Sequence, residues 1–575
     1  MKINTFYKKY ENILLSASAI FLYISFIFLR YDPIYELNDD TMIRNLLSGD
    51  YTGTPTPMNN QMMYIFSAAL SFLYKIIPSV QWFDLFLIAC QCVCLWSVLY
   101  VLIGYCNKTL YKIAILISGC LFSVTFLLNH FVLITYTVTS GMLAVTSIFL
   151  FVTGKHRVSV QSWIAIFFAV LSFCMRSELC LMLIPFICLA GVYCWSTEKT
   201  VFTTDNFKKY FGIFGVLLGC LGVVFFTDKL AYSSEEWQNF RTLFDARTTV
   251  YDYTDIPLYH LNEDFYNEED ISKQQYLLFR SYNYALDDDI DHEMMSTVAD
   301  YAKRTGVDLR EKVNIALGAY RIQVTDKIGS TYHTLTIVGY IMLLLCITRN
   351  NKFRIIISAG IVFFVRSIIW MYLWGQGRIE YRITHPLYWG EFLLLLAIYI
   401  TENRKKTGNN VKKNALIICI TIILSVVFCV SEISAFNERY SDLLLKAEQN
   451  YAVHKYCNEK GSNFYMMPTY SAGVLPEKIF DDCETPLNLE LLGGWYAKSP
   501  EYYDKLDNNS IEKVDDSILN GDIYLIQQKD YVSYDTAIPF EWLTEYYKSK
   551  GYNVEVVKTD TIVDDIEVYK IEQIN

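Results

Sequence analysis

Long apolar runs separated by short polar segments recur along the chain, and each is long enough, or nearly so, to cross a bilayer as a helix. The runs are Ile13–Leu29, Trp82–Ile103, Ile113–Leu128, Phe131–Val152, Ser162–Met175, Leu179–Trp195, Phe211–Thr227, Leu335–Thr348, Ile355–Leu373, Leu387–Thr401 and Ala415–Val430. A further apolar stretch, Gln61–Ile77, contains Lys75 and ends at Pro78. We expect this stretch to lie in the membrane interface. The pattern therefore predicts a polytopic α-helical membrane protein with about 11 transmembrane helices.

Basic residues decide the orientation of these runs. If Gln61–Ile77 does not cross, the N-terminal segment and the short loops on its side carry eighteen Lys and Arg residues, whereas the short loops opposite carry few. Because positive residues accumulate in cytoplasmic loops, the basic side is predicted to be cytoplasmic. The N-terminus is then cytoplasmic, and residues 31–81, 228–330 and 431–575 lie on the outer face.

The outer segments are predicted to differ in structure. A transmembrane domain spans residues 1–430, with an outer loop and interfacial helix at 31–81 and a helical insertion at 228–330. Within the insertion, Glu235–Val250 and Glu293–Val324 suit helices and Tyr251–Pro257 reads as an extended turn. Residues 431–575 mix helix and strand patterns and are predicted to form an extracytoplasmic α/β domain. Its expected helices are Asn437–Asn458 and Phe540–Lys550, and its expected strands are Asn463–Pro468, Asp522–Gln528, Val554–Val563 and Ile566–Ile571.

Composition agrees with a membrane protein and narrows the partners. Hydrophobic residues make up 53% of the chain and charged residues 19%, which is too apolar for an ordinary soluble chain of 575 residues. The formal net charge of -11 argues against a nucleic-acid partner. Most of the 15 cysteines lie in apolar runs, where thiols behave as small hydrophobic groups and show no metal-ligand spacing. Two cysteines in the predicted outer part, Cys457 and Cys483, are candidates for a disulfide, but the sequence does not give the distance between them.

Two kinds of charged residue carry the candidate chemistry. Asp39 and Asp40 follow the first apolar run by about ten residues, and a carboxylate near the membrane surface is a candidate general base. Arginines lie inside or at the ends of later apolar runs, where guanidinium groups suit phosphate binding. These arginines are Arg176, Arg366, Arg378 and Arg382. A carboxylate and arginines at one membrane face together indicate chemistry on an anionic lipid.

The layout of a first span, an acidic outer loop, an interfacial helix, many further spans and an outer domain resembles the membrane glycosyltransferases of the C superfamily (GT-C). The residues that carry the resemblance are Asn38-Asp39-Asp40, Ser48-Gly49-Asp50-Tyr51-Thr52-Gly53-Thr54-Pro55 and Arg176-Ser177-Glu178. The segment from Phe240-Arg241 to Tyr251-Asp252-Tyr253 and the segment Tyr282-Asn283-Tyr284-Ala285-Leu286-Asp287 are similar to uncharacterised bacterial proteins associated with surface-polysaccharide synthesis. The resemblance implies inverting transfer of a sugar from a polyprenyl-phosphate donor to a glycan or lipid acceptor, outside a bacterial cell membrane.

The resemblance also suggests roles for the charged residues. One aspartate takes the proton of the acceptor hydroxyl. Neighbours in an extended segment point to opposite sides, and the family pattern favours Asp40, with Asp39 as a helper or surface group. The alternative is a solvated pair or a helix cap. Arg176, Arg378 and Arg382 are the candidates for the donor phosphate.

Supporting residues have structural alternatives. Arg176 has the option of pairing with Glu178 or reaching lipid headgroups. Arg366 lies within an apolar run and needs a partner, for which we expect Glu391. Arg378 and Arg382 precede His385 in a predicted short outer loop, where headgroup anchoring is equally suited. His130, between two spans, more often acts as a buried hydrogen-bonding residue than as a base.

Other functions fit parts of the same pattern. A polysaccharide polymerase or ligase also uses outer arginines, and a lipid-linked sugar transporter would place charges along a central path. A structural or sensory membrane protein is a further alternative. No cofactor or metal site is assigned, although Asp39, Asp40 and outer acidic residues could recruit a divalent cation. Membrane lipids are expected partners in every case.

Overall fold

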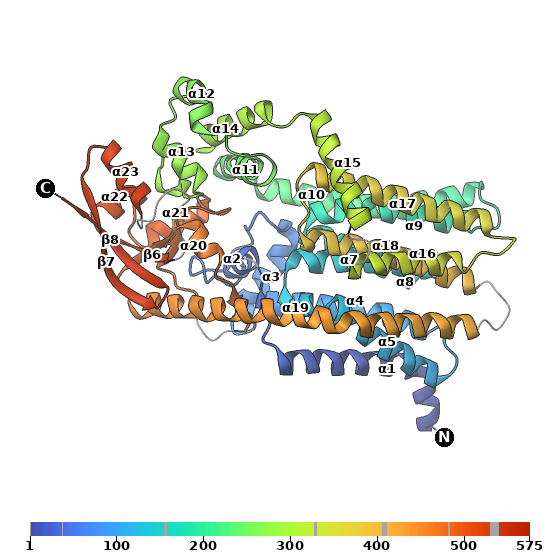
Figure 1. Cartoon of the computed structure of the whole chain (residues 1–575). Helices are drawn as coiled ribbons and strands as arrows, with labels where there is room; N and C mark the ends of the chain where they lie inside the picture. The colour runs from blue at the N-terminus through green and yellow to red at the C-terminus, as the bar shows by residue number, and fades with distance from the viewer. Residues whose placement is uncertain are drawn as a thin grey trace.

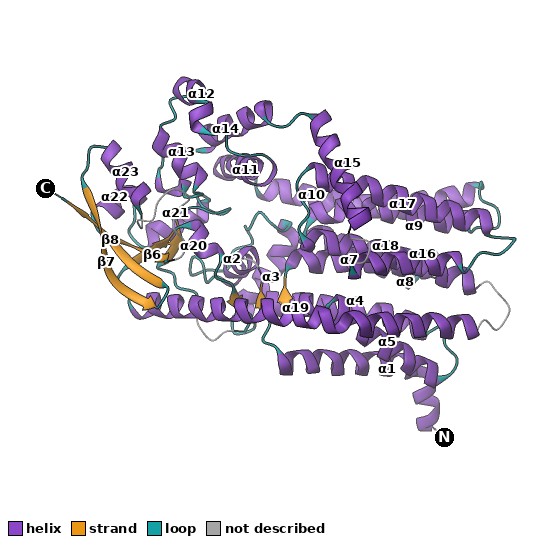
Figure 2. Cartoon of the chain, viewed as in Figure 1, coloured by secondary structure: helices purple, strands orange, loops and turns teal. Residues whose placement is uncertain are grey.

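The structure is a computed structural model that describes residues 2–36, 38–154, 158–326, 330–404, 411–480, 484–529 and 540–574. Long helices run side by side as a bundle, and residues 228–326 and the C-terminal part lie at one end of it (Figure 1). Most of the described chain is helical, and most of the strands belong to the C-terminal part (Figure 2). Cys483 lies outside the described residues, as does the proposed link to Cys457.

Eight helices of the described chain are long and apolar enough to cross a membrane. These are α1 (Lys2–Arg30), α4 (Trp82–Ile103), α5 (Thr109–Phe126), α7 (Tyr136–Thr153), α9 (Ser177–Ser196), α10 (Thr204–Ala231), α17 (Lys352–Gly375) and α18 (Tyr381–Arg404). Three further helices are apolar but shorter, namely α3 (Tyr64–Ile76), α8 (Val160–Met175) and α16 (Thr331–Leu344). The structure is thus that of a polytopic helical protein.

The last predicted run, Ala415–Val430, belongs to the 49-residue helix α19 (Val411–Glu459). The side chains of residues 411–425 are outside the described part of the chain. The helix predicted at Asn437–Asn458 is therefore not separate, because it continues the last apolar run without a break. The chain leaves the bundle through α19 and enters the C-terminal part (Figure 1).

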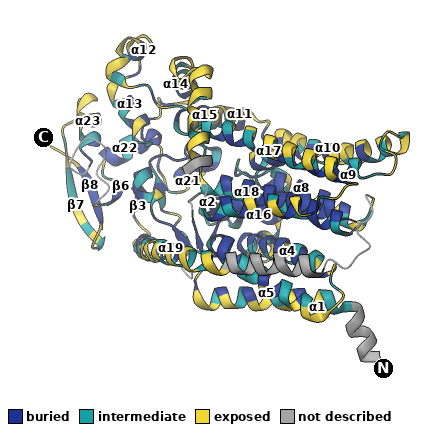
Figure 3. Cartoon of the chain, turned by 45° about the vertical axis from the view of Figure 1, so that its right-hand side comes forward, coloured by how far each residue is buried: buried dark blue, intermediate teal, exposed yellow. Residues whose placement is uncertain are grey.

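The centre of the bundle is α7. In the most apolar 18 residues of α7, 94% are buried, whereas in α1 the share is 22%. Figure 3 shows that α18 and α8 are also largely buried. Gly141 of α7 allows close approach of α18, because a Cβ there would lie 2.6 Å from Pro386. The Ser140 hydroxyl donates to the Ser172 carbonyl of α8 at 2.9 Å. Small and hydroxylated residues therefore bring these helices together.

The predicted run Phe131–Val152 is not one helix. The short helix α6 (Leu128–Val132) is followed by strand β2 (Leu133–Ile134), and α7 begins only after β2. β2 pairs in parallel with β1 (Ile34–Tyr35), which also pairs antiparallel with β4 (Glu477–Lys478). This pairing between distant segments takes the backbone out of the helical conformation, and the run alone carries no sign of it.

The insertion is mostly helical. Its elements are α11 (Glu235–Thr248), the π-helical turn η1 (Thr249–Tyr253), the 3-10 turn η2 (Tyr259–Leu261), α12 (Glu263–Glu268), α13 (Lys273–Arg280), the 3-10 turn η3 (Tyr284–Leu286), α14 (His292–Thr305) and α15 (Leu309–Asp326). Two helices replace the single predicted stretch Glu293–Val324, since the chain turns at Gly306. The predicted turn at Tyr251–Pro257 begins in η1 and is therefore only partly extended.

The C-terminal part holds a five-stranded sheet in the order β5-β3-β6-β8-β7. The strands are β3 (Phe464–Met467), β5 (Leu489–Leu491), β6 (Ile523–Gln528), β7 (Val554–Val563) and β8 (Ile566–Gln573). β3 pairs in parallel with β5 and β6, and β8 pairs antiparallel with β6 and β7. The accompanying helices are α20 (Thr469–Gly473), α21 (Pro500–Asn508), α22 (Val514–Leu519) and α23 (Glu541–Ser549). The four predicted strands are confirmed, and β5 was missed because three residues give no pattern.

The insertion packs against the C-terminal part. The Tyr282 carbonyl accepts a hydrogen bond from the Thr469 hydroxyl at 2.7 Å, and the Ala285 N–H donates to the Leu492 carbonyl at 3.0 Å. A Cβ on Gly493 would lie 1.9 Å from the Tyr282 oxygen, so only glycine fits there. One continuous group of buried apolar side chains extends from the bundle into both the insertion and the C-terminal part. These two parts thus form a joint cover over one end of the bundle.

Candidate functional site

Asp39 and Asp40 lie in the first turn of α2 (Asn38–Ser48), not in the extended segment expected from the sequence. The prediction was wrong because α2 begins at Asn38, before the pair. Successive residues of a helix are about 100° apart, so the two carboxylates still diverge. Asp40 is 0% exposed, whereas Asp39 is partly exposed.

Asp40 holds the start of the central helix. Its Oδ1 accepts the Tyr136 N–H at 2.6 Å, which satisfies a free donor at the N-terminus of α7. Burial raises the pKa of the Asp40 carboxyl well above its usual range, and Asp39 and Glu36 act in the same direction, whereas the Tyr136 N–H and Arg382 oppose it. The Oδ2 atom is buried without a hydrogen-bond partner among the described residues. Asp40 is thus positioned to support α7 rather than to meet a substrate.

Arg176 lies at the break between α8 and α9. Its Nη1 donates to the Tyr136 hydroxyl and to Gln61 Oε1, and its Nε pairs with Glu178 at 3.2 Å. The Tyr136 hydroxyl also donates to Gln61 at 3.1 Å. The expected pairing with Glu178 is therefore present, but Glu178 is largely exposed and leaves Arg176 accessible from outside. Tyr136 links this arginine to Asp40.

Arg378 and Arg382 do not act together. Arg378, between α17 and α18, pairs with Asp252 of the insertion at 3.3 Å and lies 5.4 Å from the Tyr253 ring. Arg382 lies in the first turn of α18, not in a loop, because the helix begins at Tyr381. The charge of Arg382 acts on Asp40 and Glu36. The two predicted arginines therefore act on different carboxylates, Arg378 on Asp252 and Arg382 on Asp40 and Glu36.

Near Arg382, several polar side chains have partners within the protein. Burial raises the pKa of Glu36 to about 7, and Glu36 forms an ion pair with Arg439 of α19. His130 Nε2 and His385 Nδ1 are 2.8 Å apart. Burial lowers the pKa of His130 to about 3, so its ring is neutral. The expectation that His130 is a buried hydrogen-bonding residue is confirmed.

Arg366 belongs to the scaffold. As predicted, it pairs with Glu391, at 2.8 Å, and both side chains are almost fully buried. Glu391 also accepts the Tyr340 hydroxyl at 2.8 Å. The pair joins α17 to α18 within the bundle.

The sequence interpretation missed Arg247, which lies in α11 and is 7% exposed. Its guanidinium lies 5.2 Å from the Phe244 ring and 5.5 Å from the Tyr282 ring. Nε and Nη1 of Arg247 have no hydrogen-bond partner among the described residues. Asp39 is one of the charges that act on both Arg247 and Arg176. Arg247 lies in the segment from Phe240-Arg241 to Tyr251-Asp252-Tyr253. The similarity of this segment to other bacterial proteins was the one sequence feature that pointed to it.

The site therefore has a partly exposed carboxylate, Asp39, whose charge acts on two arginines with unequal partners. Asp252 also acts on both arginines and pairs with Arg378. In the described ranges no group of three His, Cys, Asp or Glu residues is arranged to hold a metal ion. The arrangement suits proton removal by Asp39 and stabilisation of an oxyanion by arginine.

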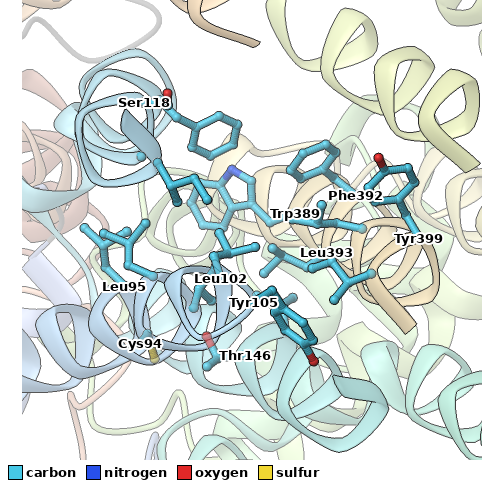
Figure 4. Close-up of a pocket in the computed structure, with 18 of the residues that line it drawn as sticks. Cys94, Leu95, Leu102, Tyr105, Ser118, Thr146, Trp389, Phe392, Leu393 and Tyr399 are labelled. Carbon is cyan, nitrogen blue, oxygen red and sulfur yellow. The ribbon is translucent and has the colours of Figure 1, made fainter. Parts of the chain in front are cut away.

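A separate cavity of about 380 Å³ lies inside the bundle, between α4, α5, α7 and α18 (Figure 4). It follows α18 from Trp389 to Asn403, a rise of about 21 Å. Its walls are mainly Leu, Phe and other apolar side chains, with no charged residue among them. The cavity therefore offers space for an apolar chain.

Comparison with protein-family models, with curated proteins and with solved structures finds no match for this chain.

Proposed function

We propose that the chain is a GT-C-like inverting glycosyltransferase that moves a sugar from a polyprenyl-phosphate donor to a cell-surface glycan or lipid acceptor. The observation that carries this proposal is the position of Asp39, partly exposed and near Arg176 and Arg247, at the end of an apolar helical bundle. A base beside arginines at the membrane surface suits a substrate whose leaving group is a lipid phosphate.

The proposed reaction is a single displacement. The acceptor O–H gives its proton to Asp39 while its oxygen forms a bond to the anomeric carbon. The bond from that carbon to the phosphate oxygen breaks, and the lipid phosphate leaves with the electron pair. Configuration at the anomeric carbon inverts, because attack and departure occur on opposite faces.

Asp39 is a better base than Asp40 on physical grounds. Asp40 is fully buried and engaged with the Tyr136 N–H, and its raised pKa disfavours the charged form. Asp39 is partly exposed, and its charge acts on Arg176 and Arg247. We therefore assign the base to Asp39 and a positioning role to Asp40, the reverse of the order that the resemblance favours.

Arg176 and Arg378 are proposed to meet the lipid phosphate. Both lie at the ends of apolar helices, where a phosphate attached to a membrane-embedded chain has to stay. Each is held by an acidic partner that a phosphate can replace or share, Glu178 for Arg176 and Asp252 for Arg378. Two guanidinium groups would offset the charge that grows on the leaving oxygen.

The proposal includes a topology of 11 spans in a bacterial cell membrane, with a cytoplasmic N-terminus and both outer segments extracytoplasmic. The charge asymmetry of the loops supports this orientation. In the structure the insertion and the C-terminal part lie at the same end of the bundle, as the proposal requires (Figure 1). Asp39, Arg176 and Arg378 belong to that end.

The test uses the full chain in proteoliposomes with a panel of polyprenyl-phosphate sugars, and measures release of polyprenyl phosphate. Asp39→Asn is expected to lower release at least about a hundredfold, the usual contribution of a general base, with an unchanged melting temperature. Asp255→Asn, an exposed aspartate of the insertion, is the matched control. Full activity of Asp39→Asn would refute the assigned base. Elongation of a lipid-linked acceptor would indicate a polymerase, and sugar movement without release would indicate a transporter.

A further inference from the structure

Arg247 is the one arginine near Asp39 whose described surroundings provide rings but no acceptor. Its Nε and Nη1 are buried and unpaired, although a guanidinium normally satisfies its N–H groups when it leaves water. Contacts with the Phe244 and Tyr282 rings offset part of the lost hydration. They accept no conventional hydrogen bond, so the donors still lack a partner.

The location of Arg247 separates it from the lipid phosphate. Arg176 and Arg378 lie at helix ends of the bundle, whereas Arg247 is carried by α11, which lies beyond the end of α10 (Figure 1). Asp252 acts on both Arg247 and Arg176 and pairs with Arg378, so a carboxylate lies among the three cations. An anion at Arg247 would therefore be held by the insertion, whereas Arg176 and Arg378 lie at ends of bundle helices.

Aromatic side chains form the wall beside Arg247. The Tyr282 and Tyr251 rings are in edge contact with centroids 4.1 Å apart, and the Tyr251 hydroxyl donates to the Phe279 carbonyl at 2.6 Å. Tyr282 has a left-handed backbone with φ of 62°, and its carbonyl is held by Thr469. The ring next to Arg247 is thus fixed by both the insertion and the C-terminal part. A fixed aromatic wall beside an unpaired guanidinium suits a ring-shaped ligand with an anionic group.

We infer that Arg247 binds an oxyanion carried by a sugar, either a carboxylate or a phosphate substituent, so that the substrate class of this site is an acidic saccharide. Nε and one Nη of an arginine form a fork that matches two oxygens of such a group. This inference rests on the proposed function, because it takes from it that the ligand is a saccharide. It concerns the binding of the ligand and not the transfer reaction. The Arg247 subsite and the Asp39 base can therefore fail separately.

The experiment measures binding of glucuronate, glucose 6-phosphate and neutral glucose to the full chain in detergent, by ligand-observed NMR titration. Glucuronate carries a carboxylate and glucose 6-phosphate carries a phosphate, so the two ligands show which oxyanion Arg247 binds. At least one is expected to bind about tenfold more tightly than glucose, as one charge-assisted hydrogen bond provides. Arg247→Gln should remove this preference, Arg247→Lys should keep a part of it, and the exposed Arg280→Gln should leave it unchanged.

Equal binding of the three ligands would overturn the inference and leave Arg247 as an arginine held by rings alone. Loss of the preference in Arg176→Gln but not in Arg247→Gln would also overturn it, because the anion would then occupy the lipid-phosphate position. Asp39→Asn should lower transfer at least about a hundredfold while preserving the preference for acidic sugars. Absence of transfer in the wild type, with the preference intact and dependent on Arg247, would refute the proposed function and support the subsite.

Discussion

Breaking the ion pair between Arg366 and Glu391 should strongly destabilise the bundle. Both side chains are almost fully excluded from solvent, and the charged atoms are 2.8 Å apart. Arg366→Ala leaves the Glu391 carboxylate with only the Tyr340 hydroxyl, at 2.8 Å. Removing one partner of a buried pair costs about 3–5 kcal/mol, since the other charge is left uncompensated. Glu391→Ala should cost a similar amount, because Arg366 would keep only the His333 ring at 3.4 Å and Tyr320 at 3.5 Å.

The double variant should be less destabilised than the sum of the two single variants, by about 1–3 kcal/mol, because no unpaired charge remains. The assay is reversible unfolding in mixed detergent micelles, followed by tryptophan fluorescence, with the free energy of unfolding compared across the cycle. Phe364→Ala on the same helix, at a side chain that is 64% exposed, is the control and should change stability far less. Strictly additive losses would show that the two residues act independently and would refute the pairing as the reason for their burial.

Three further results are expected. Cysteine tags at Asn350 and Asn267 should react from the cytoplasmic and the outer side respectively, and labelling of both from one side would contradict the proposed topology. Burial raises the pKa of Glu501 to about 7, so the folded state binds more protons than the unfolded state between pH 4.5 and 7. Stability should then fall by about 2–3 kcal/mol as pH rises through this range, and Glu501→Gln should flatten the profile in pH-dependent unfolding. Gly493→Ala would place a Cβ 1.9 Å from a carbonyl of the insertion, so it should expose the insertion to limited proteolysis, whereas Gly473→Ala, with open space around it, should not.

Sequence patterns predicted the elements whose cause is local. Trp82–Ile103 and Val554–Val563 have the predicted boundaries, because a long, mainly apolar run fixes the helix and alternation fixes the strand. The partner of Arg366 could also be predicted, since a guanidinium within an apolar run demands a carboxylate on a neighbouring span. Elements that depend on distant pairing could not be predicted. The β1–β2 pairing that shortens the helix of α7 joins residues about a hundred positions apart.

The site shows the same division between local and distant causes. Asp39, Asp40 and Arg176 were found because charged residues beside apolar runs are conspicuous. Their roles depend on burial, which a single sequence does not reveal, and burial is what separates Asp39 from Asp40. Arg247 was missed because its segment is polar and helical, where an arginine is ordinary. Its burial against the Phe244 and Tyr282 rings depends on how the insertion folds, which the local pattern does not reveal.

Tyr136 explains why the site requires the complete fold. Its N–H donates to Asp40 of α2, and its hydroxyl contacts Gln61 and Arg176 at the two neighbouring segments. The β1–β2 pairing places this tyrosine at the first turn of α7, where the N–H is free to be accepted by a side chain. If α7 began five residues earlier, as the apolar run suggests, this N–H would bond within the helix and Asp40 would lose its partner. The break before α7 is thus the structural feature that joins the aspartate pair to the arginine.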